Sequence, residues 1–202
     1  MTSLVHWDWD LIYREGTPVW ETGRPSAELI RFLDEKRIGR GSALDIGCGT
    51  GADAVYMVRR GLEVTAVDSS PTAIERARVR AELEDALPRF VLADFFEFAQ
   101  TAGTFDFVYD SGSYHYIRQI DLDRYLDGLW RVTRPGSYYM TLAAAPNERI
   151  EGAPPPVTKR QLYSELGRLF EVVRLEEIRM PSPILPDGYP AWSCLMQRPV
   201  VK

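Results

Sequence analysis

The sequence predicts an α/β protein with a doubly wound, mostly parallel seven-stranded sheet that ends in an antiparallel hairpin. Two observations lead to this prediction. Short apolar runs alternate with stretches of helical periodicity along most of the chain, which is the pattern of repeated βαβ units. The last two apolar runs, near 171–179 and 191–198, are joined without a helix. Adjacent strands joined in this way pair antiparallel.

The earlier elements follow in order. Strands are expected over 43–47, 62–68, 89–94, 105–110 and 137–145, and helices over 52–61, 70–83, 121–133 and 158–170. The first strand runs into a glycine-rich turn, and the helix after it ends at Gly61. The second helix has Ser70 at its cap and Pro71 at its first position, while the third stops before Pro135.

The chain is long enough for one soluble domain over 1–202, with 45% hydrophobic and 26% charged residues. We expect an N-terminal flap over 1–25, a ligand-binding core over 40–145, and a substrate-side loop with the terminal hairpin over 146–202. The proline-rich stretch 146–156 is long enough to form a wall of a site.

The composition limits the classes of binding partner that we expect. The net charge is -5 and no basic run is present, so we expect no nucleic-acid partner. No apolar stretch is long enough to cross a bilayer, the first residues do not resemble a leader, and only two cysteines occur. We therefore expect a cytoplasmic protein with a small-molecule partner and no metal ion.

A glycine turn, "LDIGCGTGA" (44–52), connects the first strand to the first helix. Glycines at 47, 49 and 51 allow backbone angles closed to other residues and let a ligand rest on the main chain. Gly47, Gly49 and Ala52 also satisfy the dinucleotide fingerprint, so the turn by itself leaves a nicotinamide-dependent enzyme open.

Four aspartates lie at or near the carboxyl ends of four successive predicted strands: Asp45, Asp68, Asp94 and Asp110. Ligands of open α/β sheets bind at that edge. Asp45 would repel a pyrophosphate and attract an ammonium or sulfonium group. Asp68 can accept the hydroxyls of a ribose, and Asp94, followed by Phe95, offers an acceptor beside an aromatic ring. Each could instead be a cap or a solvated turn residue, but together they favour adenosine joined to an amino acid.

Five motifs in order resemble those of class I S-adenosylmethionine-dependent methyltransferases over about residues 40 to 145: "LDIGCGTG", "VTAVDSS", "LADFFEF", "FDFVYDSGSYHYI" and "LWRVTRPGSYYMTLAA". The resemblance implies a Rossmann-like methyltransferase fold with S-adenosylmethionine as cofactor and S-adenosylhomocysteine as product. It also implies the cofactor contacts: Asp45, Gly47, Cys48 and Gly49 around the methionine part, Asp68 and Ser69 at the ribose, Asp94 and Phe95 at the adenine, and Asp110 and Ser111 on the methionine side.

The run "YREGTPVWETGRPSAEL" (13–29) resembles the N-terminal segment of the thiopurine and thiol methyltransferase branch, including its bacterial relatives. The resemblance implies that Tyr13 and Trp20 close the site and that Arg24 attracts an acceptor's negative charge. A surface charge is the alternative for Arg24. Trp7 and Trp9 are expected to pack against the domain.

His115 is one of only two histidines in the chain. It lies in the segment 113–117, which follows the fourth strand. We expect this segment, including Tyr114, to face the methyl acceptor. Three roles stay open for it: lining the acceptor pocket, general-base catalysis, and structural hydrogen bonding. A base matters little for a thiol of pKa about 8.5 and more for a phenol of pKa about 10. The other histidine, His6, is expected at the surface or in the flap.

The sequence therefore favours methyl transfer to a small molecule, with the sulfur of a thiol first and nitrogen or oxygen of a heteroaromatic or phenolic metabolite as the alternative. Ser113 and Tyr114 stand in a segment that varies between members of this branch, so the sequence does not determine the identity of the acceptor. Two rivals remain, a nicotinamide-dependent oxidoreductase and a non-catalytic relative that keeps the cofactor. Asp45 and the lack of a Tyr-Lys pair disfavour the first.

Overall fold

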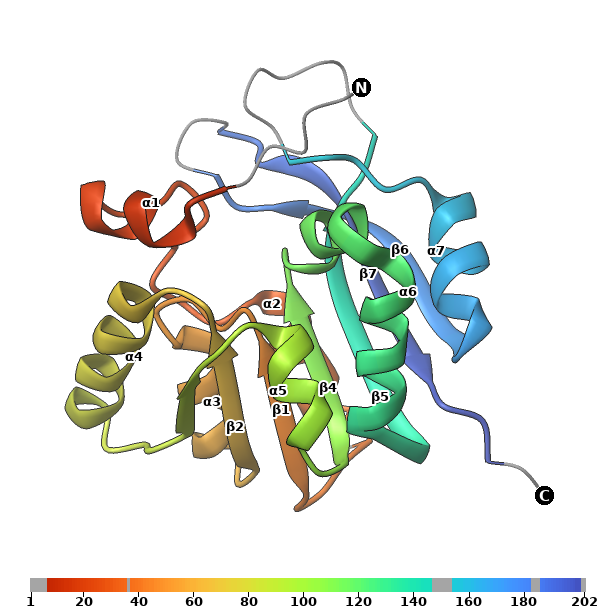
Figure 1. The fold of residues 1–202 in the computed structure, drawn as a ribbon, viewed down its shortest axis with the longest axis horizontal. Helices are drawn as coiled ribbons and strands as arrows, with labels where there is room; N and C mark the ends of the chain where they lie inside the picture. The colour runs from red at the N-terminus through yellow and green to blue at the C-terminus, as the bar shows by residue number, and fades with distance from the viewer. Residues whose placement is uncertain (1–6, 36, 147–153, 183–185, 201–202) are drawn as a thin grey trace.

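The structure, a computed structural model, describes residues 7–35, 37–146, 154–182 and 186–200. Its sheet has seven strands in the order β3-β2-β1-β4-β5-β7-β6 (Figure 1). The strands are β1 (Ser42–Ile46), β2 (Glu63–Asp68), β3 (Arg89–Leu92), β4 (Phe105–Ser111), β5 (Thr133–Ala144), β6 (Glu171–Met180) and β7 (Tyr189–Gln197). The first five are parallel, and β7 pairs antiparallel with both β5 and β6. The predicted fold class, including the terminal hairpin, is confirmed.

The helices are α1 (Trp9–Glu15), α2 (Ala27–Asp34), α3 (Ala52–Arg59), α4 (Pro71–Leu83), α5 (Phe95–Thr101), α6 (Tyr114–Val132) and α7 (Lys159–Glu165), with a 3-10 turn, η1 (Leu166–Arg168). The helices α1, α2 and α5 are additions to those expected from periodicity. The helix expected at 121–133 forms the second part of α6 and follows Asp121, whose backbone angles are not helical. The first part of α6, which begins at Tyr114, was not expected from the sequence.

Local signals explain where several helices begin. The Ser70 hydroxyl accepts a hydrogen bond from the Ala73 N–H, and Pro71 occupies the first turn of α4, as expected. Thr158 and Gln161 form a reciprocal capping box at the start of α7. Asp94 caps α5 by accepting from the Phe96 N–H at 2.7 Å. Each cap satisfies an amide that the helix itself leaves without a partner.

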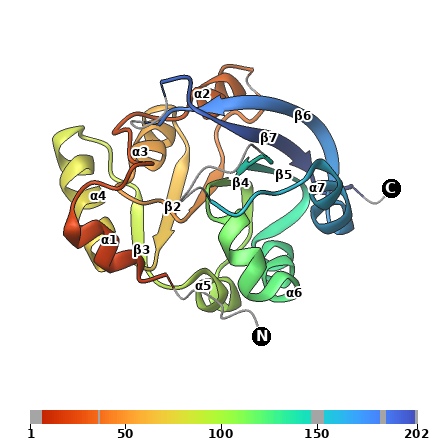
Figure 2. The ribbon, with the colours of Figure 1, turned by 90° about the horizontal axis from the view of Figure 1, so that it is seen from above.

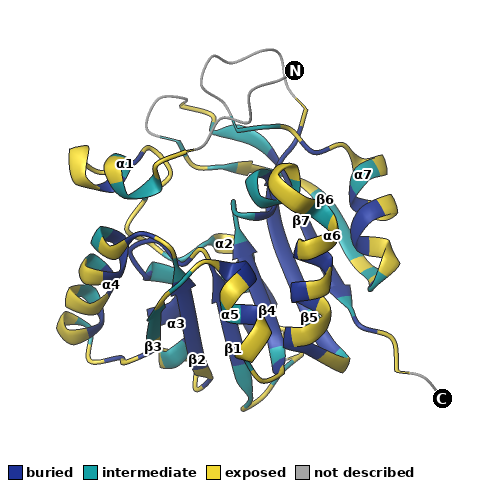
Figure 3. Cartoon of the chain, in the orientation of Figure 1, coloured by how far each residue is buried: buried dark blue, intermediate teal, exposed yellow. Residues whose placement is uncertain are grey.

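Helices cover both faces of the sheet (Figure 2). Because side chains alternate along a strand, Leu44 and Ile46 of β1 pack with the helices α5, α6 and α7, whereas Ala43 packs with α2, α3 and α4. The same alternation separates Val108 from Phe107 on β4. Figure 3 shows the central strands as buried throughout most of their length. Near-continuous burial is typical of parallel sheets covered on both sides.

The strand order reverses between β1 and β4, which are direct neighbours. The helix after β1 lies on one face and the helix after β4 on the other, so the chain diverges at this point and leaves a crevice at the carboxyl ends of the strands. Among the described residues, none of the helices combines the length and apolarity that a membrane span requires.

Candidate active site

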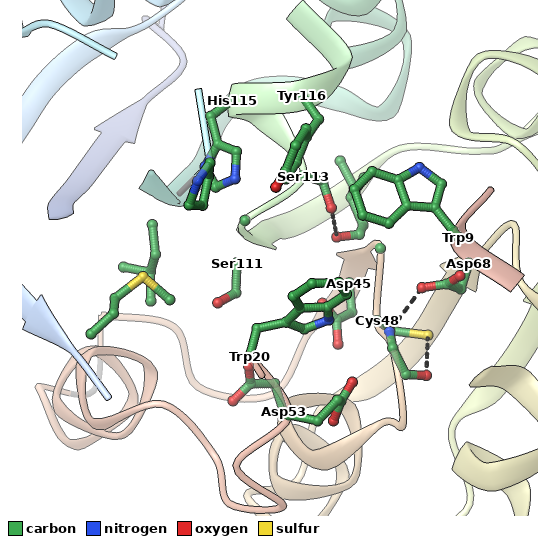
Figure 4. Close-up of a pocket in the computed structure, with 18 of the residues that line it drawn as sticks. Trp9, Trp20, Asp45, Cys48, Asp53, Asp68, Ser111, Ser113, His115 and Tyr116 are labelled. Atoms are coloured by element: carbon green, nitrogen blue, oxygen red, sulfur yellow. Dashed lines mark hydrogen bonds between the residues drawn. The ribbon is translucent and has the colours of Figure 1, made fainter. Parts of the chain in front are cut away.

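A cavity of about 2100 Å³ lies at this crevice, bounded by the carboxyl ends of the strands, the flap and the start of α6 (Figure 4). Single small-molecule pockets usually occupy about 300 to 1,000 Å³, so this one has room for two ligands. Thirteen of the fifteen residues predicted for the site line it: Tyr13, Trp20, Arg24, Asp45, Gly47, Cys48, Gly49, Asp68, Ser69, Asp94, Phe95, Ser111 and His115. Asp110 and Tyr114 do not.

The glycine turn has the backbone that its sequence suggested. Gly47 and Gly49 have φ of 66° and 52°, in the left-handed region that favours glycine. A Cβ at position 47 would lie 2.0 Å from the Ser113 Oγ and one at position 49 would lie 2.3 Å from the Glu21 Oε1, so a side chain at either position would also displace Ser113 or Glu21. The Gly49 N–H donates to Asp68 at 2.9 Å, which fixes the turn against the end of β2.

Asp45 is a buried carboxylate on the wall of the cavity. Only 2% of the residue is exposed, and its Oδ2 has no hydrogen-bond partner within the part of the chain described by the structure. Burial raises the pKa of Asp45 well above its usual range, and the nearby carboxylates of Asp53, Asp110, Asp68 and Glu21 raise it further. An orphaned acceptor among like charges on a cavity wall fits a cationic group such as an ammonium.

Two further carboxylates of this region were not singled out from the sequence. Glu21 of the flap lies over the glycine turn and accepts from the Tyr13 hydroxyl at 2.9 Å and from the Thr50 N–H and hydroxyl at 3.1 and 2.5 Å. Asp53, in the first turn of α3, accepts from the Ser26 N–H at 2.7 Å, and burial raises its pKa to about 6. The sequence signal for Asp53 was its place two residues after Gly51, the last glycine of the turn.

Asp68, Ser69, Asp94 and Phe95 bring the ends of β2 and β3 to the same cavity. Asp68 is already bound to the N–H groups of Gly49 and Ser70, and burial raises its pKa. Asp94 is exposed at the cap of α5. Phe95 is only 5% exposed, with its ring centroid 5.4 Å from that of Tyr125 in the core, so it contributes to the wall without opening a broad ring face.

The expectation that Asp110 faces the cofactor is wrong. The residue is fully buried, and its carboxylate accepts from the N–H groups of Ser113 and Tyr114 and from the hydroxyls of Tyr125 and Tyr139. Burial is the first cause of a pKa raised to about 6, and these hydrogen bonds oppose it. Asp110 therefore caps α6 from inside the core and does not reach the cavity.

The expectation that Tyr114 contacts the acceptor is wrong for a related reason. Its side chain is fully buried in the core cluster, where its hydroxyl donates to Glu165 at 2.7 Å. Glu165 also binds Arg118 in a mostly buried ion pair. The helix that begins at Tyr114 turns His115 and Tyr116 toward the cavity and Tyr114 away from it.

His115 is 2% exposed and lines the cavity from the first turn of α6 (Figure 4). Its Nδ1 accepts a hydrogen bond from the Ala144 N–H at 3.2 Å. Burial lowers its pKa to about 3, so the ring is neutral near pH 7. Its centroid lies 4.6 Å from that of Tyr116.

An aromatic cluster connects the flap to α6. The ring centroids of Trp9 and Tyr116 are 4.8 Å apart, those of Trp9 and Trp20 are 6.0 Å apart, and Trp7 stacks on Trp9 at 5.8 Å. The Trp20 indole donates to the Tyr13 hydroxyl at 3.3 Å. Trp7 and Trp9 thus pack against the remainder of the protein, as expected, and they also line the cavity together with Trp20.

The remaining predictions concern Arg24, Cys48 and the loop 146–156. Arg24 is exposed and lies on the cavity wall. Cys48 is a buried free cysteine whose pKa is raised by burial, so it is an unreactive wall residue. Of the loop 146–156, residues 154–156 line the cavity, while 147–153 lie outside the described residues, as does His6.

Comparisons with known proteins agree with this architecture. Residues 43–136 match a family described as "Methyltransferase domain". A 2-heptyl-1-hydroxyquinolin-4(1H)-one methyltransferase of Mycobacteroides abscessus is 30% identical over 81% of this chain and 73% of its own length. A probable thiol methyltransferase of Arabidopsis thaliana is 27% identical over 83% and 75%.

Among solved structures, one described as "Conversion of a Disulfide Bond into a Thioacetal Group during Echinomycin Biosynthesis" superposes with a TM-score of 0.80 at 26% identity, covering 94% of this chain and 90% of the other. The glycine turn, the carboxylates at the strand ends and these similarities lead to one conclusion. The chain belongs to the S-adenosylmethionine-dependent methyltransferases.

Proposed function

We propose that this protein transfers the methyl group of S-adenosylmethionine to a small-molecule acceptor, with S-methylation of a thiol favoured. The observation that carries the cofactor assignment is the buried Asp45 carboxylate, whose Oδ2 has no partner among the described residues and which faces a cavity lined by further carboxylates. A dinucleotide would bring more negative charge into this region, whereas the amino-acid part of S-adenosylmethionine brings an ammonium group.

The residues at the ends of β1, β2 and β3 form the cofactor end of the cavity. There Asp45 would accept hydrogen bonds from the ammonium group. The turn from Gly47 to Gly49 would let the methionine part lie on the main chain, and Asp68 with Ser69 would hold the ribose. Asp94 and Phe95 would border the adenine. Bound there, S-adenosylmethionine supplies a methyl group activated by a sulfonium.

The acceptor end lies beyond β4, where the start of α6 meets the ends of β5 and the terminal hairpin. Its wall includes His115, Tyr116, Leu142, Met180 and Tyr189. In the flap, Trp9 and Trp20 line the cavity, and their closure over bound ligands would limit the access of water. Exclusion of water favours a reaction in which a sulfonium and an anion become two neutral groups.

A thiol suits this acceptor end because it needs no strong base. A thiol of pKa about 8.5 is a few per cent thiolate at pH 7. His115, with its pKa near 3, is a poor base at that pH. The similarity to a protein called a probable thiol methyltransferase supports the same choice.

The second candidate is O-methylation of a hydroxylated heteroaromatic compound. Two observations favour it. The rings of Trp9, Trp20 and Tyr116 border the cavity and provide flat apolar surface for an aromatic acceptor. A relative at 30% identity is a 2-heptyl-1-hydroxyquinolin-4(1H)-one methyltransferase.

The test measures methyl transfer from labelled S-adenosylmethionine to matched panels of thiols, phenols and hydroxylated quinolones, with calorimetry against S-adenosylhomocysteine and NADH. We expect S-adenosylhomocysteine to bind, NADH not to bind, and thiols to be methylated fastest. Cofactor binding without transfer to any acceptor would point to a non-catalytic relative. Faster transfer to the hydroxyquinolone would replace the thiol with the second candidate.

A further inference from the structure

The His115 imidazole is held in one tautomer by the main chain. β4 ends at Ser111, which pairs with Leu142 on β5. Ala144 lies two residues further along β5, so its N–H has no residue of β4 opposite it. It donates to the Nδ1 of His115 instead, at 3.2 Å. A main-chain N–H can only donate, so Nδ1 must carry a lone pair. The neutral ring therefore carries its hydrogen on Nε2.

Nε2 is the nitrogen left for a ligand. His115 is almost completely buried and lines the cavity, and across the described residues its ring makes one hydrogen bond, through Nδ1. A ring N–H that opens on a cavity is free to donate to a ligand or water there. The acceptor end therefore offers a fixed hydrogen-bond donor at this position.

The charges around His115 do not favour a change of its protonation. The ionisable side chains that line this end are Tyr116 from α6, Tyr189 from β7, Arg179 from β6 and Arg118, which is paired with Glu165. Burial raises the pKa of both tyrosines, that of Tyr116 to about 12, so both are neutral.

Among the described residues at this end of the cavity, no unpaired carboxylate is present to stabilise an imidazolium. Glu28 lines the cavity from α2, but its carboxylate is bound by Arg31 and the Ser193 hydroxyl. The other carboxylates on the described wall belong to the flap, to β1 and α3, and to the ends of β2 and β3. Burial without a counter-charge keeps His115 neutral.

We propose that His115 donates its Nε2–H to the acceptor atom, and that the enzyme consequently selects acceptors which bind as anions: thiols and acidic hydroxyl groups, in preference to ordinary phenols and alcohols. This inference rests on the proposed function and deepens it, because it names the acceptor class by its acidity. The acceptor's proton leaves to solvent before binding is complete. The anion then attacks the methyl carbon, the carbon–sulfur bond breaks, and its electron pair stays on the sulfur.

The pH dependence follows from this assignment. If the acceptor ionises before transfer, kcat/KM at low pH rises tenfold for each pH unit and reaches a plateau at the acceptor's own pKa. The plateau should move when the acceptor is changed from a 4-substituted thiophenol to the phenol of the same ring. A general base of the protein would instead give a pH profile whose position does not follow the acceptor.

Two variants separate a donor from a base. Gln at position 115 can accept from the Ala144 N–H with Oε1 and donate with Nε2, but it has no basic nitrogen. We expect His115→Gln to keep kcat/KM for thiophenol within about fivefold of wild type with an unchanged pH profile. We expect His115→Leu, which lacks both functions, to lose about 10- to 100-fold. S-adenosylhomocysteine affinity and the melting temperature are measured for both variants, so that a folding defect is recognised.

A second readout needs no turnover. Histidine labelled with ¹⁵N gives signals from His6 and His115 only, and His6→Asn assigns them. In the S-adenosylhomocysteine complex we expect His115 to show the Nε2–H tautomer without titration between pH 5 and 8. Addition of 4-substituted thiophenol, used at a pH where it is ionised, should shift the Nε2 resonance, and the matched neutral phenol should shift it much less.

Three results would overturn the proposal: a titration of His115 near pH 6.5, equal losses in the Gln and Leu variants, or a pH plateau that is the same for every acceptor. Failure of the proposed function is recognised separately. A thiophenolate-dependent shift of Nε2 with no methylated product from any acceptor would support the donor role and count against methyl transfer.

Discussion

At the scale of single residues, two aspartates on neighbouring strands show why position at a strand end does not define a role. Asp45 and Asp110 are both buried, and burial is the first cause of the raised pKa of each. Asp110 accepts hydrogen bonds from two main-chain N–H groups and two tyrosine hydroxyls. Asp45 leaves Oδ2 without a partner within the described chain. Asp45 therefore retains the capacity to bind a cation.

We expect Asp45→Asn to weaken S-adenosylhomocysteine binding by about 10- to 100-fold, which corresponds to the about 1.5 to 3 kcal/mol of a hydrogen bond to a charged group. The same substitution should raise the melting temperature of the ligand-free protein, because it removes a negative charge from a buried cluster of carboxylates. Calorimetry and thermal melting, both at pH 7, measure the two effects.

Asp110→Asn is the matched control on the adjacent strand. It should lower the melting temperature, since an amide NH₂ would face groups that now donate to the carboxylate, while the folded protein keeps its affinity for S-adenosylhomocysteine. Equal affinities for wild type and Asp45→Asn would contradict the assignment of Asp45 to the ammonium.

Asp53 gives a prediction for pH. Its pKa of about 6 in the folded protein lies above the value of about 3.9 expected when unfolded, so the folded state holds the proton over this interval and the unfolded state does not. The contribution of Asp53 to stability is consequently lost as pH rises from about 4 through about 6. Relative to wild type, Asp53→Asn should therefore gain stability over that interval, while still accepting from the Ser26 N–H.

Melting temperatures of the two proteins, compared at half-unit steps from pH 4 to 7.5, measure this difference. The comparison between variants is needed because carboxylates such as Asp106, whose pKa is lowered, give the opposite slope in both proteins. A difference that does not change with pH would show that the pKa of Asp53 is ordinary.

At the scale of elements, the flap is held by the face of α4 rather than by a core of its own. Arg76 donates to the carbonyl oxygens of Tyr13 and Gly16, and Arg80 donates to those of Gly23 and Thr50. The carboxylate of Asp10 accepts from α4 in return. The position of the aromatic cluster over the cavity thus depends on a helix that lies outside the predicted site.

Loss of one of these contacts should loosen the flap selectively. We expect Arg76→Ala to increase hydrogen exchange over residues 9–20 and to raise KM for S-adenosylmethionine several-fold, because ordering the flap then costs more on binding. The melting temperature should change little. Arg78→Ala, at an exposed position on the same helix, is the control and should leave both quantities unchanged. Unchanged exchange in Arg76→Ala would contradict a role for α4 in holding the flap.

At the scale of the whole molecule, the proposed cofactor and acceptor ends belong to one cavity, on the two sides of the point where the strand order reverses. Binding at this site is therefore linked to global stability. S-adenosylhomocysteine at 100 times its Kd should add about 2.7 kcal/mol to the free energy of unfolding. For a chain of this size that corresponds to a rise of about 5 to 10 °C in melting temperature. NADH at the same concentration should produce no shift, and a shift with NADH alone would contradict the cofactor assignment.

The sequence predicted the sheet well because each strand is a short apolar run and the terminal hairpin lacks a connecting helix. It did not predict α5, whose seven residues are too few to show a clear helical period, and whose cap, Asp94, also lines the cavity. It also missed the first part of α6, from Tyr114 to the interruption at Asp121, because the carboxylate that caps this part, Asp110, lies on the preceding strand and not directly before Tyr114.

The sequence by itself determined the strands, the glycine turn and the convergence of acidic residues on one edge of the sheet, since these depend on local pattern and on the rule that parallel strands end at the same edge. Only the tertiary structure decided which of these residues enter the cavity. In the register of β1 and β4, Asp45 pairs with Tyr109, whereas Asp110 pairs with Ile46, which packs against α6. Because side chains alternate between the two faces of a sheet, a register offset of one residue sends Asp45 and Asp110 to opposite faces, and register depends on contacts between strands far apart in the sequence.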